Sequence, residues 1–222
     1  MTGALPWITL EGVNGVGKSY LARRAATELG DRCVPLVELS DSHPGLLPGR
    51  IIDALLAGGD PFLRTGCPQT ETLLLAALQV HRYETTTVRA GQVVLEDRGP
   101  HSVAVYQAAV LGGDAASDDE TFTEAQGLLD LMARWRPLPG RTILVLDDPA
   151  SCRRRFEERL GRPALPGEIG LMERVTRLYG RFAAALPHRF EVLDRRRLDA
   201  NACADSIVAV CRQAAGVSRW PR

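Results

Sequence analysis

The sequence predicts an α/β fold in which helices cover both faces of a parallel β-sheet. Five short apolar runs have the length and the β-branched or leucine-rich composition of buried strands, and they lie at residues 8–10, 34–39, 93–96, 142–146 and 190–193. Between the runs, apolar residues recur at three- and four-residue intervals, for example from Phe122 to Trp135 and from Met172 to Leu186, as in helices that pack on one face. Strands that alternate with helices build a parallel sheet, because each crossover brings the chain back to the same edge.

One element is ambiguous and the rest of the chain forms one unit. Val103 and Val105 alternate as in a strand, but the crossover topology favours a helix between Ser102 and Leu111. With 222 residues and 45% hydrophobic residues, the chain can bury one sizeable core, and no long polar linker interrupts it. We therefore expect a single domain over residues 1–222 that ends in a short tail at 216–222.

The first strand leads into a glycine-rich loop and then into a helix-like segment. The loop carries Gly12 and Gly17 separated by four residues and followed by Lys18 and Ser19, which is the pattern that cradles the phosphates of a nucleoside triphosphate. Lys18 would reach the β- and γ-phosphates, and the Ser19 hydroxyl would ligate Mg²⁺. An ordinary glycine-rich turn would not need the whole pattern in this strand-and-helix context. The predicted donor-binding residues are Gly12, Asn14, Gly15, Val16, Gly17, Lys18, Ser19 and Tyr20.

Charged residues follow two further strands at their carboxyl ends, where ligands bind in such sheets. Asp97 and Arg98 come after residues 93–96, and Asp147 follows residues 142–146. Asp97 can act as a base or anchor a magnesium ion, and Arg98 can clamp a phosphate. The alternative is a surface ion pair that caps the next helix. We expect these strand ends to line one cleft with the phosphate loop.

Composition narrows the cellular setting and the partners. Lys and Arg together equal Asp and Glu at 27 each, so net charge favours no nucleic-acid, membrane or acidic partner. The five cysteines are widely spaced and have no zinc-ligand pattern, which is typical of free thiols in a reducing compartment. The chain has no run of 18 apolar residues, and its first strand begins too early to leave room for a signal peptide. We expect a cytoplasmic protein whose partner is a small molecule, with no nucleic acid and no membrane.

Several blocks of the sequence resemble the thymidylate kinase family. Residues 97–107 are similar to its Asp-Arg-x-x-x-Ser-x-x-Ala-Tyr-Gln block, with Val105 in place of Ala, and residues 11–18 are similar to its Glu-Gly-x-Asp-Gly-x-Gly-Lys loop. Residues 144–147, followed by Arg155 and Arg159, match its Leu-x-Leu-Asp strand and arginine-bearing lid, and residues 177–183 resemble its Arg-x-Tyr-x-x-Leu-Ala helix.

The resemblance implies a three-layer P-loop NTPase fold with a five-stranded parallel sheet, and a kinase that takes its phosphoryl group from ATP with Mg²⁺. It also implies a mobile lid at about residues 153–168 and a possible homodimer. Glycines and prolines between Gly161 and Gly167 make a continuous helix there unexpected. The catalytic residues that we expect are Lys18, Asp97, Arg98, Arg155 and Arg159, with Ser19 and Asp97 as the metal ligands.

The departures from the family lie on the acceptor side. Asn14 stands where the family has an Asp, His43 falls in its Arg-Glu segment, and Leu75 replaces the aromatic that stacks on thymine. Gln79 replaces an Arg that grips the acceptor's phosphate, although Arg82 could compensate one helical turn later. Losing that charge argues against a phosphorylated acceptor. The predicted acceptor-binding residues are Glu11, Asn14, His43, Leu75, Gln79, Arg82, Arg98, Ser102, Tyr106 and Gln107, and His101 is also expected near this site.

These departures leave the acceptor open. A phosphate acceptor needs no protein base, whereas a hydroxyl acceptor needs one, and Asp97 or Glu96 is placed for that role. A nucleotide or nucleoside is the acceptor that we favour, ahead of a hydroxyl on a natural product such as an aminosugar. A GTPase switch would carry an Asn-Lys-x-Asp sequence, which is absent here. A nucleotide-binding module without turnover would not need both Asp97-Arg98 and an arginine-bearing lid.

Overall fold

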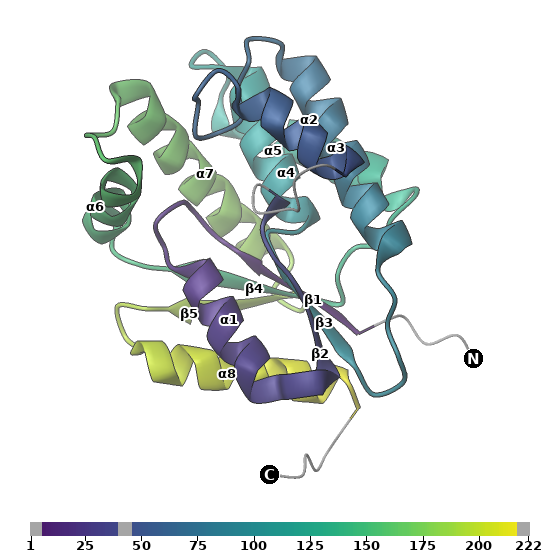
Figure 1. The fold of residues 1–222 in the computed structure, drawn as a ribbon. Helices are drawn as coiled ribbons and strands as arrows, with labels where there is room; N and C mark the ends of the chain where they lie inside the picture. The colour runs from purple at the N-terminus through teal and green to yellow at the C-terminus, as the bar shows by residue number, and fades with distance from the viewer. Residues whose placement is uncertain (1–5, 40–45, 217–222) are drawn as a thin grey trace.

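The computed structural model describes residues 6–39 and 46–216, and it confirms the predicted five-stranded parallel sheet with helices on both faces (Figure 1). Each neighbouring pair of strands runs parallel, in the order β2-β3-β1-β4-β5. The strands are β1 (Trp7–Glu11), β2 (Cys33–Leu36), β3 (Val93–Asp97), β4 (Arg141–Leu146) and β5 (Phe190–Asp194).

Strand β2 is shorter than the predicted run at residues 34–39. It lies at the edge of the sheet and pairs only with β3, and the pairing ends where Leu36 lies opposite Glu96. One residue later β3 ends at Asp97, and Arg98 turns the chain with a φ of 63°. The chain beyond Leu36 therefore has no strand to pair with, and residues 37–39 run instead toward the site described below.

The described residues contain eight α-helices and one short 3₁₀ turn, and all of them except α8, which follows the last strand, lie between strands. Helices α1 and α8 pack together on one face of the sheet, and α3, α4, α5 and α7 cover the other face (Figure 1). The helices are α1 (Lys18–Leu29), α2 (Leu47–Leu56), α3 (Pro68–Thr85), α4 (Pro100–Gly112), α5 (Asp118–Ala133), α6 (Pro149–Leu160), α7 (Pro166–Ala185) and α8 (Ala200–Ala214), with the turn η1 at Gly30–Arg32.

Helix α4 resolves the one ambiguous segment of the sequence in favour of a helix, as the topology predicted. It lies at the centre of its layer, between α3, α5 and α7, and every residue from Pro100 to Ala109 is buried. A helix that is enclosed on all sides needs no polar face, so its sequence lacks the 3.6-residue period. This is why Val103 and Val105 gave the pattern of a strand.

The segment predicted as a lid spans two helices and their connection. Residues 153–160 complete α6, Gly161 ends that helix with a φ of 67°, and Pro166 opens α7. No continuous helix runs through residues 161–167, as expected, since residues 161–165 are not helical. Pro166 and Gly167 nevertheless belong to α7, because proline fits the first turn of a helix, where its missing N–H is not needed. Mobility of this segment stays a prediction.

The surface beside α7 carries ion pairs between acidic residues and arginines. In the part of the chain that the structure describes, no helix combines the length and apolarity needed to span a bilayer. The acidic residues after α4 face arginines of α7, so their charges are balanced at an exposed surface where such pairs add little stability. The pairs are Asp114 with Arg174, Asp118 with Arg177, and Asp119 with Arg181.

Candidate active site

The glycine loop that follows β1 adopts a backbone that other residues would strain. Gly12, Gly15 and Gly17 have φ angles of 139°, 77° and 94°. A Cβ atom on Gly12 would lie 2.5 Å from the carbonyl oxygen of Val145, and one on Gly15 would lie 2.0 Å from that of Cys152. The glycines are therefore required both by conformation and by close packing of the loop against β4 and α6.

Lys18 is the first residue of α1, and its side chain folds back over the loop. Its Nζ donates hydrogen bonds of 2.9 Å to the carbonyl oxygens of Gly12 and Val13. Burial lowers the pKa of Lys18 to about 7, with the charge of Arg98 acting in the same direction. A buried ammonium beside a helix N-terminus is an environment that a bound phosphate would complement.

Asp97 ends β3 beside the start of α1. Its side chain is only 3% exposed, and its Oδ1 has no hydrogen-bond partner among the described residues. Burial raises the pKa of Asp97, against lowering contributions from Lys18 and from a hydrogen bond with Ser19. Mg²⁺ binds one or two carboxylates together with phosphate oxygens, and within residues 6–39 and 46–216 the buried Oδ1 of Asp97 is a free carboxylate oxygen beside the phosphate loop. Ser19 and Asp97 thus fit the predicted magnesium site.

Two predicted donor-binding residues can contribute only through their backbone. The side chain of Val16 is fully buried in the core. Tyr20 is 47% exposed on α1, where its hydroxyl accepts a hydrogen bond of 3.1 Å from Arg24. Their backbone N–H groups lie in and beside the phosphate loop, which is the part of each residue that the pattern requires.

Arg98 links the phosphate loop to the acceptor side of the cleft. Its Nε lies 2.7 Å from Oε1 of Glu38, and its Nη2 donates to the side-chain oxygen of Asn14. The guanidinium also lies over the ring of Tyr106, 5.1 Å from the ring centroid. The hydroxyl of Tyr106 contacts Asn14 in turn, with 3.1 Å between the hydroxyl and the side-chain oxygen.

The sequence predicted that Glu11 binds the acceptor, and this prediction is wrong. Glu11 is fully buried beneath the loop and does not reach the acceptor site. Its carboxylate accepts hydrogen bonds from the backbone N–H of Gly99 at 3.0 Å, from the hydroxyl of Tyr179 at 3.0 Å and from the hydroxyl of Ser102. Burial raises the pKa of Glu11 to about 7 despite these hydrogen bonds. Glu11 therefore holds the turn after β3 in place from within the protein core.

A cavity of about 390 Å³ opens beside Arg98 and is lined by residues of several elements. Seven predicted acceptor residues line it, together with the predicted catalytic Arg159. These are Asn14, Leu75, Gln79, Arg98, Ser102, Tyr106 and Gln107. The sequence did not point to the other lining residues, which are Glu38, Leu39, Leu56, Pro61, Phe62, Leu63 and Val103. His43 lies outside the described residues.

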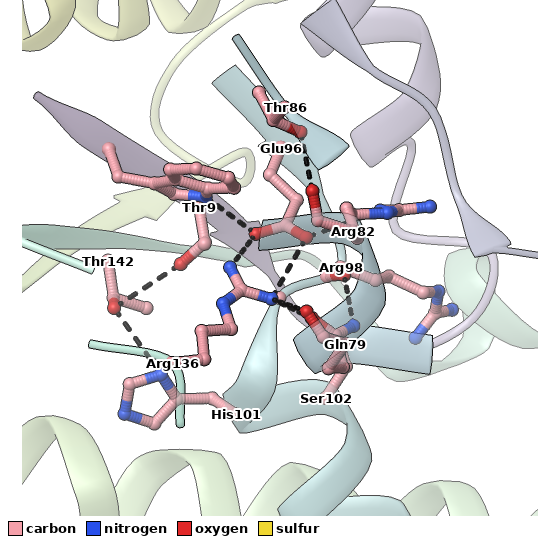
Figure 2. A network of polar contacts seen from close by, with 12 residues as sticks. Thr9, Gln79, Arg82, Thr86, Glu96, Arg98, His101, Ser102, Arg136 and Thr142 are labelled. Atoms are coloured by element: carbon pink, nitrogen blue, oxygen red, sulfur yellow. Dashed lines mark hydrogen bonds and ion pairs between the residues drawn. The ribbon is translucent and has the colours of Figure 1, made fainter. Parts of the chain in front are cut away.

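A buried polar network joins Gln79 of the cavity wall to Arg136 and Glu96 (Figure 2). Arg136 is 1% exposed, and its guanidinium lies between the carboxylate of Glu96 and the side-chain oxygen of Gln79 (Figure 2). The distance between Nη2 of Arg136 and Oε2 of Glu96 is 2.5 Å. The amide nitrogen of Gln79 then donates to the carbonyl oxygen of Arg98 at 3.2 Å. The Trp7 indole donates to Glu96 at 2.8 Å. The network thus connects the core to the left-handed turn at Arg98.

This network overturns three expectations. Glu96 is not placed as a base, because its carboxylate is fully buried and held by Arg136 and Trp7. Arg82 does not replace the missing phosphate-binding arginine, because its Nη1 lies 3.3 Å from Glu96 and it does not line the cavity. His101 does not touch the acceptor site, because its ring packs edge-on against the aromatic core near Phe190, where burial lowers its pKa to about 3.

Two arginines, one from α6 and one directly after β5, reach the phosphate loop. Arg155 donates to the carbonyl oxygen of Gly15 at 2.9 Å and pairs with Asp147, with 2.5 Å between Nη2 and Oδ2. Arg195, which sequence reasoning missed, donates to the carbonyl oxygen of Val16 at 2.6 Å. Its position directly after β5, at the same edge of the sheet, was the signal that could have identified it.

Comparison with known proteins finds that the chain is similar to thymidylate kinases along most of its length. No protein-family profile matches it. It is 36% identical over 205 residues to the thymidylate kinase of Clavibacter sepedonicus, covering 87% of this chain and 88% of the relative, and 32% identical over 204 residues to that of Dinoroseobacter shibae, covering 90% and 93%. The solved structure of thymidylate kinase from Ehrlichia chaffeensis shares the fold, with a TM-score of 0.65 at 20% identity over 94% of this chain and 99% of that one.

Proposed function

Because the chain belongs to the thymidylate kinase family and is therefore a small-molecule kinase, we propose that it transfers the γ-phosphoryl group of Mg²⁺-bound ATP to a nucleotide or nucleoside held in the cavity beside Arg98. Asn14 carries this proposal, since it belongs to the phosphate loop and also lines the cavity. Donor and acceptor sites therefore share a wall, as direct transfer between them requires.

The donor side is assigned from the geometry of the loop. Lys18 and the loop N–H groups would bind the phosphates, and Ser19 and Asp97 would hold Mg²⁺, which when bound neutralises phosphate charge. Arg155 already contacts the loop through Gly15. Arg159 lines the cavity and faces it from α6, so that its guanidinium would stabilise charge that develops between the two ligands.

The acceptor side suits a planar base. The cavity volume of about 390 Å³ falls within the range for small-molecule sites. Phe62 and Tyr106 form a stacked pair with ring centroids 6.0 Å apart, and Leu75 adds an apolar surface. Gln79 and Gln107 also line the cavity, although Gln79 already bonds Arg98 and Arg136. Apolar walls with a few polar groups are typical of pockets that bind a nucleobase.

The proposal is tested by measuring ADP formation from Mg²⁺-ATP with a panel of nucleosides, nucleoside monophosphates and aminosugars, followed by phosphorus NMR of the product. We expect turnover of a nucleoside or nucleotide, and we expect Lys18→Met to abolish most of it. Calorimetric titration with ATP provides the control for donor binding. Binding of ATP without turnover of any acceptor would favour a nucleotide-binding module, and turnover of an aminosugar alone would favour a natural-product kinase.

A further inference from the structure

The acceptor cavity has one carboxylate among its charged lining residues, against two arginines. Among its described lining residues, the charged ones are Glu38, Arg98 and Arg159. Glu38 follows the short strand β2 and is carried to the cavity because the chain leaves the sheet after Leu36. A phosphate monoester brings a charge of about −1.5 to −2 and is bound by unopposed arginines that form bidentate pairs. A carboxylate inside the cavity is unfavourable for such a ligand.

Glu38 forms an ion pair with Arg98, the arginine that a bound phosphate would need. The 2.7 Å ion pair joins its Oε1 to Nε of Arg98, whose Nη2 is bound to Asn14. The side chains of Glu38 and Arg98 are 23% and 11% exposed, so that the pair is largely shielded from water. Burial raises the pKa of Glu38, but Arg98 and Lys18 outweigh it and hold the pKa below its usual value. The carboxylate is thus ionised at neutral pH.

Of the two positions on α3 that could supply a second phosphate-binding cation, one is neutral and the other is already engaged. Gln79 carries no charge, and both ends of its amide are bonded, to Arg136 and to the carbonyl oxygen of Arg98. Arg82 pairs with Glu96, with 3.3 Å between Nη1 and Oε1, and it is not among the cavity-lining residues. Arg159 remains on the α6 side of the cavity, where it also serves the donor in the proposed reaction.

We propose that Glu38 makes the cavity selective for an acceptor with a free hydroxyl group, a nucleoside in preference to its monophosphate, and that its carboxylate accepts the hydroxyl proton. This inference rests on the phosphoryl transfer proposed above. The acceptor oxygen forms a bond to the γ-phosphorus, the bond from that phosphorus to the β,γ-bridging oxygen breaks, and its electron pair leaves with ADP. The hydroxyl proton passes to Glu38, as it passes to a catalytic carboxylate in kinases that phosphorylate hydroxyl groups.

The test compares matched acceptors with and without a 5′-phosphate, such as thymidine and its monophosphate, in wild type and in Glu38→Gln. We expect wild type to turn over the nucleoside at least about tenfold more efficiently. Glu38→Gln should lower kcat on the nucleoside by about 10²-fold or more with a smaller change in KM. The same variant should bind the monophosphate more tightly in calorimetry, by about tenfold, because it removes a negative charge and frees Arg98.

The matched control is Glu28→Gln, because Glu28 also pairs with an arginine, Arg212, but lies on α1 away from the cavity. It should leave kcat and KM unchanged, and thermal unfolding shows whether each variant is folded. The inference is overturned if wild type prefers the monophosphate, or if Glu38→Gln affects both acceptors equally or neither. If no acceptor is phosphorylated, the proposed function fails, and the binding titration alone then decides whether Glu38 excludes a phosphate.

Discussion

Replacing Arg136 by Met should lower the free energy of unfolding by about 4 kcal/mol. Arg136 and Glu96 are 1% and 0% exposed, so the substitution leaves a buried carboxylate without its closest partner. Breaking such a pair costs about 3–5 kcal/mol. The Trp7 indole at 2.8 Å and Arg82 at 3.3 Å remain, which places the loss near about 3 kcal/mol at the lower end of that range. The oxygen of Gln79 also loses its donor, which adds about 1 kcal/mol.

Urea denaturation followed by circular dichroism measures this change, and the melting temperature should fall by roughly 8–16 °C at about 2–4 °C per kcal/mol. Arg134→Met is the control, because Arg134 is an exposed arginine two residues earlier, and it should change stability by less than about 0.5 kcal/mol. In a Glu96→Gln background, Arg136→Met should cost at least about 2 kcal/mol less than in wild type. An equal cost in both backgrounds would refute the ion pair as the cause.

Three further predictions concern the phosphate loop and the core. Gly15→Ala should lower the free energy of unfolding, measured by urea denaturation, by at least about 2 kcal/mol more than Gly91→Ala. The two glycines have similar φ angles of 77° and 79°, but only Gly15 has an atom 2.0 Å from the added Cβ. Equal losses in the two variants would contradict the contact. Lys18→Met should lower kcat/KM for ATP by about 10²-fold or more while the melting temperature changes little, and a parallel loss of both would indicate a structural role. His101, with its pKa lowered to about 3, makes the protein less stable as pH falls below 6.5, whereas Glu11, with its pKa raised to about 7, makes it less stable as pH rises above 4.5. In His101→Leu the contribution of His101, which rises with pH, is removed, and that of Glu11, which falls with pH, remains. Denaturation should then show stability falling by up to about 1.4 kcal/mol for each unit that the pH rises between 4.5 and 6.5. A pH profile like that of wild type would contradict the assignment.

The layers of the fold and the donor half of the site could be predicted because their signals are local. A buried parallel strand is a short apolar run, and the phosphate loop is a contiguous pattern whose residues act largely through their backbone. Asp97 and Arg98 were found for the same reason, since they directly follow a strand. The end of β2 could not be predicted, because it depends on where β3 stops pairing.

The acceptor half depends on residues that are far apart in the sequence. Arg136 follows α5 in a segment without any motif, and only the folded chain brings it between Gln79 and Glu96. Glu38 reaches the cavity because β2 ends early, and Phe62 reaches it from a connection that has no periodic pattern. Sequence reasoning identified Gln79 as a departure from the family but could not show that its amide was already bonded. Such contacts are set by tertiary packing.

Helix α6 contacts both proposed binding sites through two adjacent residues, Phe156 at the acceptor cavity and Arg155 at the phosphate loop. The ring of Phe156 lies 5.4 Å from that of Phe62 in the cavity wall, and Arg155 donates to Gly15 of the phosphate loop. If filling the cavity displaces this helix, the work done on it must appear as a change in affinity for the nucleotide. Linkage then requires the nucleotide to change affinity for the acceptor by the same factor. The two ligands would assist or oppose each other equally, whichever arrives first.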